Sequence, residues 1–481
     1  MKFTPKRYPA ALPLGLAVIA VILLAPISAG AHAFGVRYDL PLPMWMFLIG
    51  AGAAVALSFL GISRFIRNNI DLEQSVIPVM GPGMCRIFAW VIRIVGGLLF
   101  AFVLATAFVG VDDTFHNFAP LFVWVNWWVG MAFASALLGN IWAVANPWRS
   151  LFDLFSRSFP TTPRPYPEGL GYWPATILFI GFAWCELISS FGESPRTLGW
   201  LIVGYSLITW SGMATYGRDA WCRHGEIFSV VFGLFARFAP LAGRDGRLIL
   251  RFPGAGLAID RPFPISMSIF ILTVLTTVTF DGVLETPAWA LILDWISESS
   301  TLRPTLLALQ DFGFDLLIVI KTIGLVSLIG LFALCFSGFI LVVKWVSDEA
   351  PSLGVLLGWF IPSIVPIAIA YHLSHYVFYL MTAGQQIISV ISDPFGWGWD
   401  LFGTVRHQID LGVVTAEMVW YLALAAIVLG HMFSVLIAHI IAFRAFDDAK
   451  SAIRSQYPMI FLMVGYTMLS LWILSQPIIA D

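Results

Sequence analysis

Apolar runs recur along almost the whole chain, and their length constrains the fold more than any other feature of the sequence. A run of about 20 apolar residues is long enough to cross the hydrocarbon core of a bilayer as an α-helix. A transmembrane β-strand would instead alternate apolar and polar residues over roughly ten positions. The runs here are continuous, so the sequence predicts an all-α, polytopic bundle of transmembrane helices.

The composition agrees with a membrane protein and excludes some other classes. Hydrophobic residues make up 59% of the chain and charged residues only 11%, whereas soluble domains hold about 25% charged residues. The net charge of -2 gives no sign of a nucleic-acid partner. The four cysteines are scattered without metal-site or disulfide spacing, so we interpret them as packing residues.

We place about ten spans along the chain from the length of the apolar runs. They lie near 43–62, 86–111, 120–145, 171–191, 197–216, 264–284, 315–343, 355–390, 414–443 and 458–478.

Arginine and lysine give the orientation of these spans, because loops on the cytoplasmic side hold an excess of both residues. Alternate connections hold most of them, and the opposite connections hold only Arg37, Arg196, Arg303 and Arg406. This asymmetry predicts a multi-pass protein of a cell membrane, such as the bacterial inner membrane, with both mature termini outside the cytoplasm.

The amino terminus has the layout of a secretory signal peptide. Three basic residues precede an apolar run over 12–27, and an Ala-His-Ala sequence follows it. The alternative is an uncleaved first membrane helix. We therefore divide the chain into a signal peptide or first helix over 1–33 and a single polytopic membrane domain over 34–481.

Three connections have features of their own. The longest inner connection, 217–263, is predicted to contain an interfacial helix over 227–238, and we interpret Glu226 as part of the same interface. On the outer side, 287–297 has the pattern of a surface helix, and 391–412 is a loop rich in glycine, tryptophan and aspartate.

Histidines inside apolar runs are the strongest indication of a functional site. His372 and His375 share one span and His431 interrupts the next one. Ionisable groups at membrane depth are costly and usually face a bundle interior or a pathway. Residues three apart share a helix face, so two imidazoles with a third and a carboxylate could bind Zn²⁺ or another divalent metal. The predicted ligands are His372, His375, His431 and Asp281; hydrogen bonding between helices and proton relay are the alternatives.

Other polar residues fall in the same outer half of the predicted spans. Glu186, Asp281 and Lys321 come from three different spans, and we expect them to line one cavity with His372 and His375. We take Asp281, Lys321 and Glu186 as catalytic candidates. The alternative for Glu186 and Lys321 is an intramembrane ion pair.

Several blocks of sequence also resemble a known family, and they extend over nearly the whole mature chain. They are Asn117-Phe-Ala-Pro, Leu138-Gly-Asn-Ile-Trp, Asn146-Pro-Trp-Arg, Phe232-Gly-Leu-Phe-Ala-Arg-Phe-Ala-Pro, Phe280-Asp-Gly, Tyr371-His-Leu-Ser-His-Tyr and Ser392-Asp-Pro-Phe-Gly-Trp-Gly-Trp-Asp-Leu-Phe-Gly. In this order they resemble blocks of the bacterial membrane proteins described as fenitrothion hydrolases. The resemblance implies a membrane-bound hydrolase able to cleave an organophosphate triester, and it carries over no catalytic residue.

These observations predict a metal-dependent hydrolase of a lipophilic ester such as a phosphotriester. A bound metal would lower the pKa of water toward 7 and polarise the phosphoryl oxygen. The expected partners are the lipid bilayer, a lipophilic small-molecule substrate and a membrane partner subunit, without nucleic acid. The main alternative is a proton- or ion-coupled transporter or channel, because Pro362 and Pro366 should break the helix just before the histidines. A haem-binding electron-transfer subunit is the third possibility.

Overall fold

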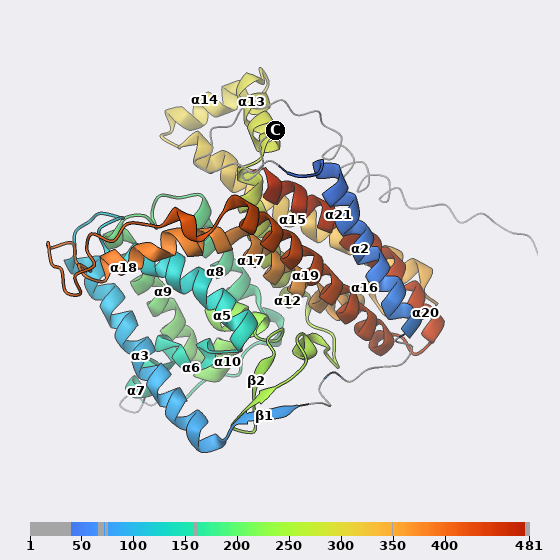
Figure 1. Cartoon of the computed structure of the whole chain (residues 1–481). Helices are drawn as coiled ribbons and strands as arrows, with labels where there is room; N and C mark the ends of the chain where they lie inside the picture. The colour runs from blue at the N-terminus through green and yellow to red at the C-terminus, as the bar shows by residue number, and fades with distance from the viewer. Residues whose placement is uncertain (1–39, 66–71, 73–75, 157–161, 349, 477–481) are drawn as a thin grey trace, which may run out of the picture.

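The computed structural model describes residues 40–65, 72, 76–156, 162–348 and 350–476 (Figure 1). The predicted signal peptide or first helix over 1–33 lies outside these residues. Within them the chain is helical apart from one small sheet, which confirms the all-α prediction.

Nine helical segments of the described residues are long and apolar enough to cross a membrane, and they coincide with nine of the predicted spans. The tenth predicted span is α9, a 22-residue helix in which polar and small residues interrupt the apolar ones. The long unbroken helices are α2 (Met44–Phe65), α3 (Pro82–Val109), α9 (Pro195–Tyr216), α12 (Ile265–Leu284), α15 (Leu316–Val346), α19 (Ala416–Ala445) and α21 (Gln456–Ser475).

Two other spans are built from shorter helical pieces. One consists of α4 (Phe118–Leu121), the π-helix η1 (Phe122–Val129) and α5 (Gly130–Leu138). The other consists of α16 (Leu353–Phe360), the 3₁₀ segment η4 (Ile361–Ile364), α17 (Val365–Thr382), η5 (Ala383–Gln386) and α18 (Ile387–Val390). Pro362 is the second residue of η4 and Pro366 lies in the first turn of α17, so the predicted helix break is confirmed.

The remaining elements are shorter, and some of them form parts of spans. They are α6 (Trp142–Ala145), α7 (Pro147–Phe155), η2 (Glu168–Leu170), α8 (Trp173–Leu187), α10 (Arg218–His224), α11 (Ile227–Phe235), η3 (Ala255–Leu257), α13 (Pro287–Glu298), α14 (Arg303–Asp311), η6 (Leu411–Val413) and α20 (Ala449–Arg454). Together η2 and α8 form one of the nine candidate spans. Only Trp289 of α13 is buried, which confirms the predicted surface helix.

The centre of the bundle is formed by α12, α17 and α19. Three quarters of the residues of α12 are buried, and α17 packs closely along α19. Gly430 of α19 lies so near α17 that a Cβ atom there would overlap the Cβ of Ala370 and approach the carbonyl oxygen of Pro366 to 2.9 Å. Small residues permit such close approach in membranes, where lipid removes the hydrophobic driving force between helices.

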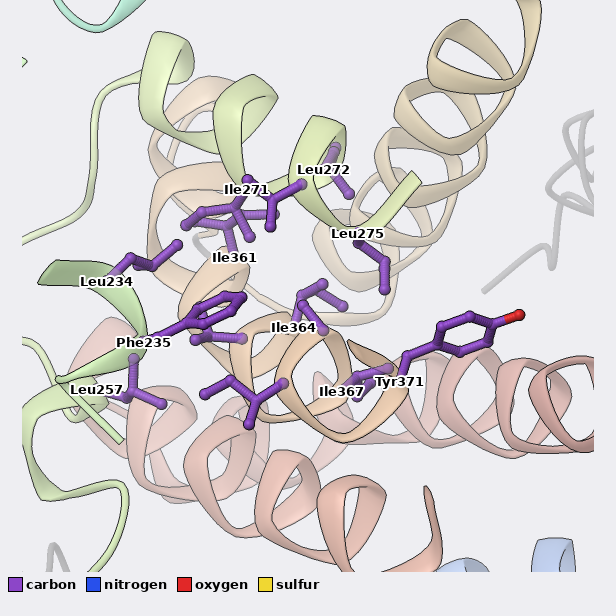
Figure 2. Packing of buried hydrophobic residues seen from close by; sticks show 14 of the residues in the cluster. Leu234, Phe235, Leu257, Ile271, Leu272, Leu275, Ile361, Ile364, Ile367 and Tyr371 are labelled. Carbon is purple, nitrogen blue, oxygen red and sulfur yellow. The ribbon is translucent and has the colours of Figure 1, made fainter. Parts of the chain in front are cut away.

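Figure 2 shows apolar side chains that meet in this core from α11, α12, η4 and α17. The hydroxyl of Tyr371 extends away from the apolar cluster there. Among the labelled residues are Leu234 and Phe235 of α11, Ile271 and Leu275 of α12, and Ile361 and Ile364 of η4.

The position of α11 differs from the prediction of an interfacial helix over 227–238. Seven of its nine residues are buried, among them Ile227, Val231 and Phe235. The physical reason is that the helix is apolar except at Ser229 and Gly233, and a helix with so little polar surface is usually buried. Helix α11 therefore belongs to the core, between α5, α8, α10 and α17.

A three-stranded antiparallel sheet was not anticipated. Its strands are β1 (Ile77–Met80), β2 (Leu241–Arg244) and β3 (Arg247–Leu250), in the order β1-β3-β2. Asp245 and Gly246 make the tight turn between β2 and β3 with positive φ angles of 51° and 72°. The sheet lies at the end of the bundle opposite α13 and α14 (Figure 1), the end that the arginine distribution predicts to be cytoplasmic.

Candidate functional site

A carboxylate and an imidazole from two central helices meet in the bundle. Oδ2 of Asp281 lies 2.9 Å from Nε2 of His375 and accepts a hydrogen bond of 2.8 Å from the hydroxyl of Tyr376. The side chains of His375 and Asp281 are 16% and 25% exposed, so the pair is mostly enclosed but not sealed. We call Asp281 and His375 the acid–imidazole pair.

The local sequence explains how three groups reach one oxygen atom. Asp281 lies in the last turn of α12, and His375 and Tyr376 are neighbours on α17, which packs against α12. The residue after Asp281 is Gly282, where a Cβ atom would lie only 2.8 Å from the hydroxyl of Tyr371. A glycine at this position therefore lets α12 and α17 approach closely enough for the hydrogen bonds to form.

A small cavity adjoins the pair. Its volume is about 10 Å³, and Glu186 of α8, His372 and Tyr376 of α17 and Trp128 of η1 contribute to its lining. Nε2 of His372 is buried without a hydrogen-bond partner. A space of this size holds about one water molecule, and buried polar atoms without partners are the usual reason for such a water. Since Tyr376 both lines the cavity and bonds to Asp281, the cavity and the pair form one polar region.

His372 and His431 have different neighbours. The ring of His372 packs edge-on against Trp128 and Phe133, at 5.8 Å between centroids in each case. His431 is fully buried on α19, where Nδ1 contacts the carbonyl oxygen of Ile427 at 2.8 Å and the ring lies 5.9 Å from that of Tyr466. The structure thus brings His375 to Asp281, and it places His431 against α21.

The predicted zinc ligands were tested against this geometry. Across the part of the chain that the structure describes, no three or more His, Cys, Asp or Glu side chains are grouped so that they could hold a metal ion. The described residues therefore do not fit the four-ligand site expected from His372, His375, His431 and Asp281. We derive no metal chemistry from them, and the divalent-metal cofactor stays a prediction.

Glu186 and Lys321 do not line the same cavity. Glu186 lines the small cavity, whereas Lys321 is on α15 and does not contribute to that lining. Among the described residues no ion pair joins the two side chains. Lys321 precedes Thr322, which accepts a 2.8 Å hydrogen bond from Trp184 and so links α15 to α8.

Two residues of evident structural importance were not singled out from the sequence. Tyr376 is the second donor to Asp281. Glu226, interpreted as an interface residue, is instead fully buried, and its carboxylate accepts five hydrogen bonds. The donors are Tyr205 Oη, Phe228 N, Trp142 Nε1, Asn146 Nδ2 and Ser229 N.

Comparison with known proteins gives no further assignment. No protein-family model, curated protein or solved structure matches this chain.

Proposed function

We propose that the protein is a proton-coupled membrane transport protein in which the acid–imidazole pair binds and releases the proton. The observation that carries this proposal is the pair of hydrogen bonds from His375 and Tyr376 to Asp281 within a bundle of apolar helices. Ionisable groups that face the interior of such a bundle are typical of proton relays.

The chemistry of the pair suits a single proton. When His375 is neutral, the pair carries the one negative charge of Asp281; an added proton produces an imidazolium next to a carboxylate and no net charge. A change between charged and neutral states alters the cost of enclosing the site, which is how proton binding can favour one conformation over another.

The neighbouring helices support the same proposal. Both segmented spans pack around the polar region: η1 contributes Trp128 to the small cavity, and α17 follows the 3₁₀ segment η4. Interrupted helices near the bilayer centre are common at transporter binding sites, and π-helical segments are frequent at functional sites. The π-helix η1 packs against α17 and against η5, the 3₁₀ segment that follows it.

Purified protein in liposomes that enclose a pH-sensitive dye tests the proposal. With an inward proton gradient and a panel of anionic, cationic and neutral solutes outside, we expect a solute-dependent change of lumenal pH. Asp281→Asn should abolish it, and Glu417→Gln, the same change at an exposed position, should not. Wild-type liposomes that show no solute-dependent pH change would contradict the proposal.

Hydrolysis is the second candidate, and the orientation of His375 favours it. A carboxylate on one imidazole nitrogen orients the ring so that the other nitrogen, Nδ1 here, can take a proton from water, as in general-base pairs. This agrees with the resemblance to fenitrothion hydrolases and requires no metal. Release of nitrophenol from a dialkyl nitrophenyl phosphate that is lost in His375→Gln and kept in Glu417→Gln would favour hydrolysis. Sensitivity of that activity to a chelator, with recovery on added zinc, would support the metal-dependent form.

A further inference from the structure

A second, larger cavity lies at the end of the bundle that is predicted to be cytoplasmic. Its volume is about 370 Å³, within the range of small-molecule sites. The two cavities share no lining residue, and α11 separates them: Leu234 lines the large cavity and Phe235 lines the small one. We call the large one the arginine cavity. Its charged and polar lining consists of Arg149, Arg223, Arg237, Asp219, Asn140, Asn146, Ser229 and Tyr172.

The charges of the lining favour an anion. Three arginines and one aspartate line the cavity, and the carboxylate of that aspartate is already engaged. Arg218, which does not line the cavity, binds both oxygens of Asp219 at 2.9 and 3.0 Å. The arginines of the cavity are therefore left with an excess of positive charge.

Arg149 is the residue with the clearest unfilled bonding capacity. Its Nη1 donates to the carbonyl oxygen of Ala143 at 3.2 Å, and its Nη2 lies 3.5 Å from Asp219. Its Nε is buried and has no hydrogen-bond partner. The side chain as a whole is 32% exposed, and the contact of Nη2 with Asp219 is long, so the guanidinium keeps donor capacity for an anion in the cavity.

Two neutral side chains, Asn140 and Asn146, also line the cavity, and hydrogen bonds fix their positions. The side-chain oxygen of Asn140 accepts a hydrogen bond of 3.0 Å from the backbone N–H of Ala143. The side-chain nitrogen of Asn140 can therefore donate to a ligand. Asn146 donates to the hydroxyl of Ser229 at 3.2 Å and to Glu226 at 2.9 Å. The buried Glu226 thus fixes the positions of two lining residues before any ligand arrives.

We propose that the arginine cavity binds a phosphate-bearing anion, either a soluble phosphate ester or the headgroup of an anionic lipid. Guanidinium groups recognise phosphoryl oxygens through paired, charge-assisted hydrogen bonds, and basic pockets between helices on the cytoplasmic side also bind lipid phosphates. The positive-inside rule alone does not account for the cavity, because that rule requires only charge near the membrane surface. Here two asparagine side chains line the same cavity as the three arginines. The assignment does not depend on proton binding at Asp281.

Calorimetric titration of the full-length protein in a neutral detergent tests the first source, with inorganic phosphate and phenyl phosphate as probes at low salt. Arg149→Gln should weaken binding about tenfold or more, because it removes charge-assisted hydrogen bonds. Arg223→Gln is the second variant; Arg223 is exposed, so this substitution should leave the fold intact. Arg247→Gln is the matched control, because Arg247 is an exposed arginine of the nearby hairpin that does not line the cavity.

Native mass spectrometry of the protein from lipid discs tests the second source. The site would be assigned to a lipid headgroup if the wild type and Arg247→Gln retain phosphatidylglycerol and Arg223→Gln loses it. It would be assigned to a soluble ester if calorimetry shows that phosphate or phenyl phosphate binds with the same pattern among these variants. The proposal is overturned if neither phosphate probe nor anionic lipid binds. It is also overturned if Arg223→Gln and Arg247→Gln behave alike, or if succinate binds more tightly than phosphate.

Discussion

Replacement of Glu226 by glutamine should destabilise the protein strongly, although the side chain keeps its shape. The carboxylate is fully buried and accepts five hydrogen bonds, two at Oε1 and three at Oε2. An amide has one acceptor oxygen, so its NH₂ group must face at least the two donors at Oε1, Tyr205 and the backbone N–H of Phe228. The tyrosine hydroxyl can rotate to accept, but the backbone N–H cannot.

The loss in the free energy of unfolding can be estimated from these contacts. One orphaned buried N–H costs about 1–3 kcal/mol, and the loss of charge assistance in the remaining bonds adds about 1 kcal/mol, so Glu226→Gln should cost roughly 2–4 kcal/mol. Glu226→Ala orphans all five donors, which at the low end of about 1 kcal/mol each gives about 5 kcal/mol. Glu168→Gln, at an exposed glutamate, should stay within about 0.5 kcal/mol of the wild type.

Unfolding by titration with sodium dodecyl sulfate in mixed micelles measures these free energies. A Glu226→Gln protein as stable as the Glu168→Gln control would refute the reasoning, because it would mean that the buried donors find other acceptors.

Three further predictions concern helix packing, topology and the outer loop. Gly430→Ala should lower the free energy of unfolding by about 1–3 kcal/mol through overpacking, whereas Gly181→Ala, in a helix with open space at that position, should not; the same titration separates them. A reporter enzyme fused within 391–412 should be active only outside the cytoplasm, and cytoplasmic activity would overturn the orientation. The hydrogen bond from His116 lowers the pKa of Asp113, so this carboxylate favours folding above its unfolded pKa, and the contribution is lost as the pH falls through the folded value. Removal of the ring in His116→Ala should raise that pKa in an NMR titration; an unchanged pKa would contradict the assignment.

The spans and the helix break could be predicted because they depend on local sequence. The length of an apolar run sets whether a helix can cross the bilayer, and proline at 362 and 366 interrupts backbone hydrogen bonding whatever surrounds it. The turn at Asp245-Gly246 was equally local, since Asp-Gly between short apolar segments is a strong hairpin signal. The hairpin could therefore have been predicted from the sequence. The burial of α11 could also have been predicted, because its residues are apolar except at Ser229 and Gly233.

The choice of partners within the bundle could not be predicted in the same way. Depth in the membrane identified Asp281 and His375, and both lie in the polar region of the structure. Depth also suggested that His431 belongs to the same site, but its position around the axis of α19 places its ring near that of Tyr466. Because α12, α17 and α19 are apolar on most sides, the sequence gives little indication of which face meets which neighbour.

Infrared difference spectroscopy during a pH titration tests proton binding at the acid–imidazole pair most directly. In the wild type we predict a titrating imidazole signal that is lost in His375→Gln and shifted in Asp281→Asn, because Nε2 of His375 contacts the Asp281 carboxylate at 2.9 Å. Glu417→Gln should leave the signal unchanged. A titration that is identical in the wild type, Asp281→Asn and His375→Gln would contradict the assignment of this pair as the proton-binding site.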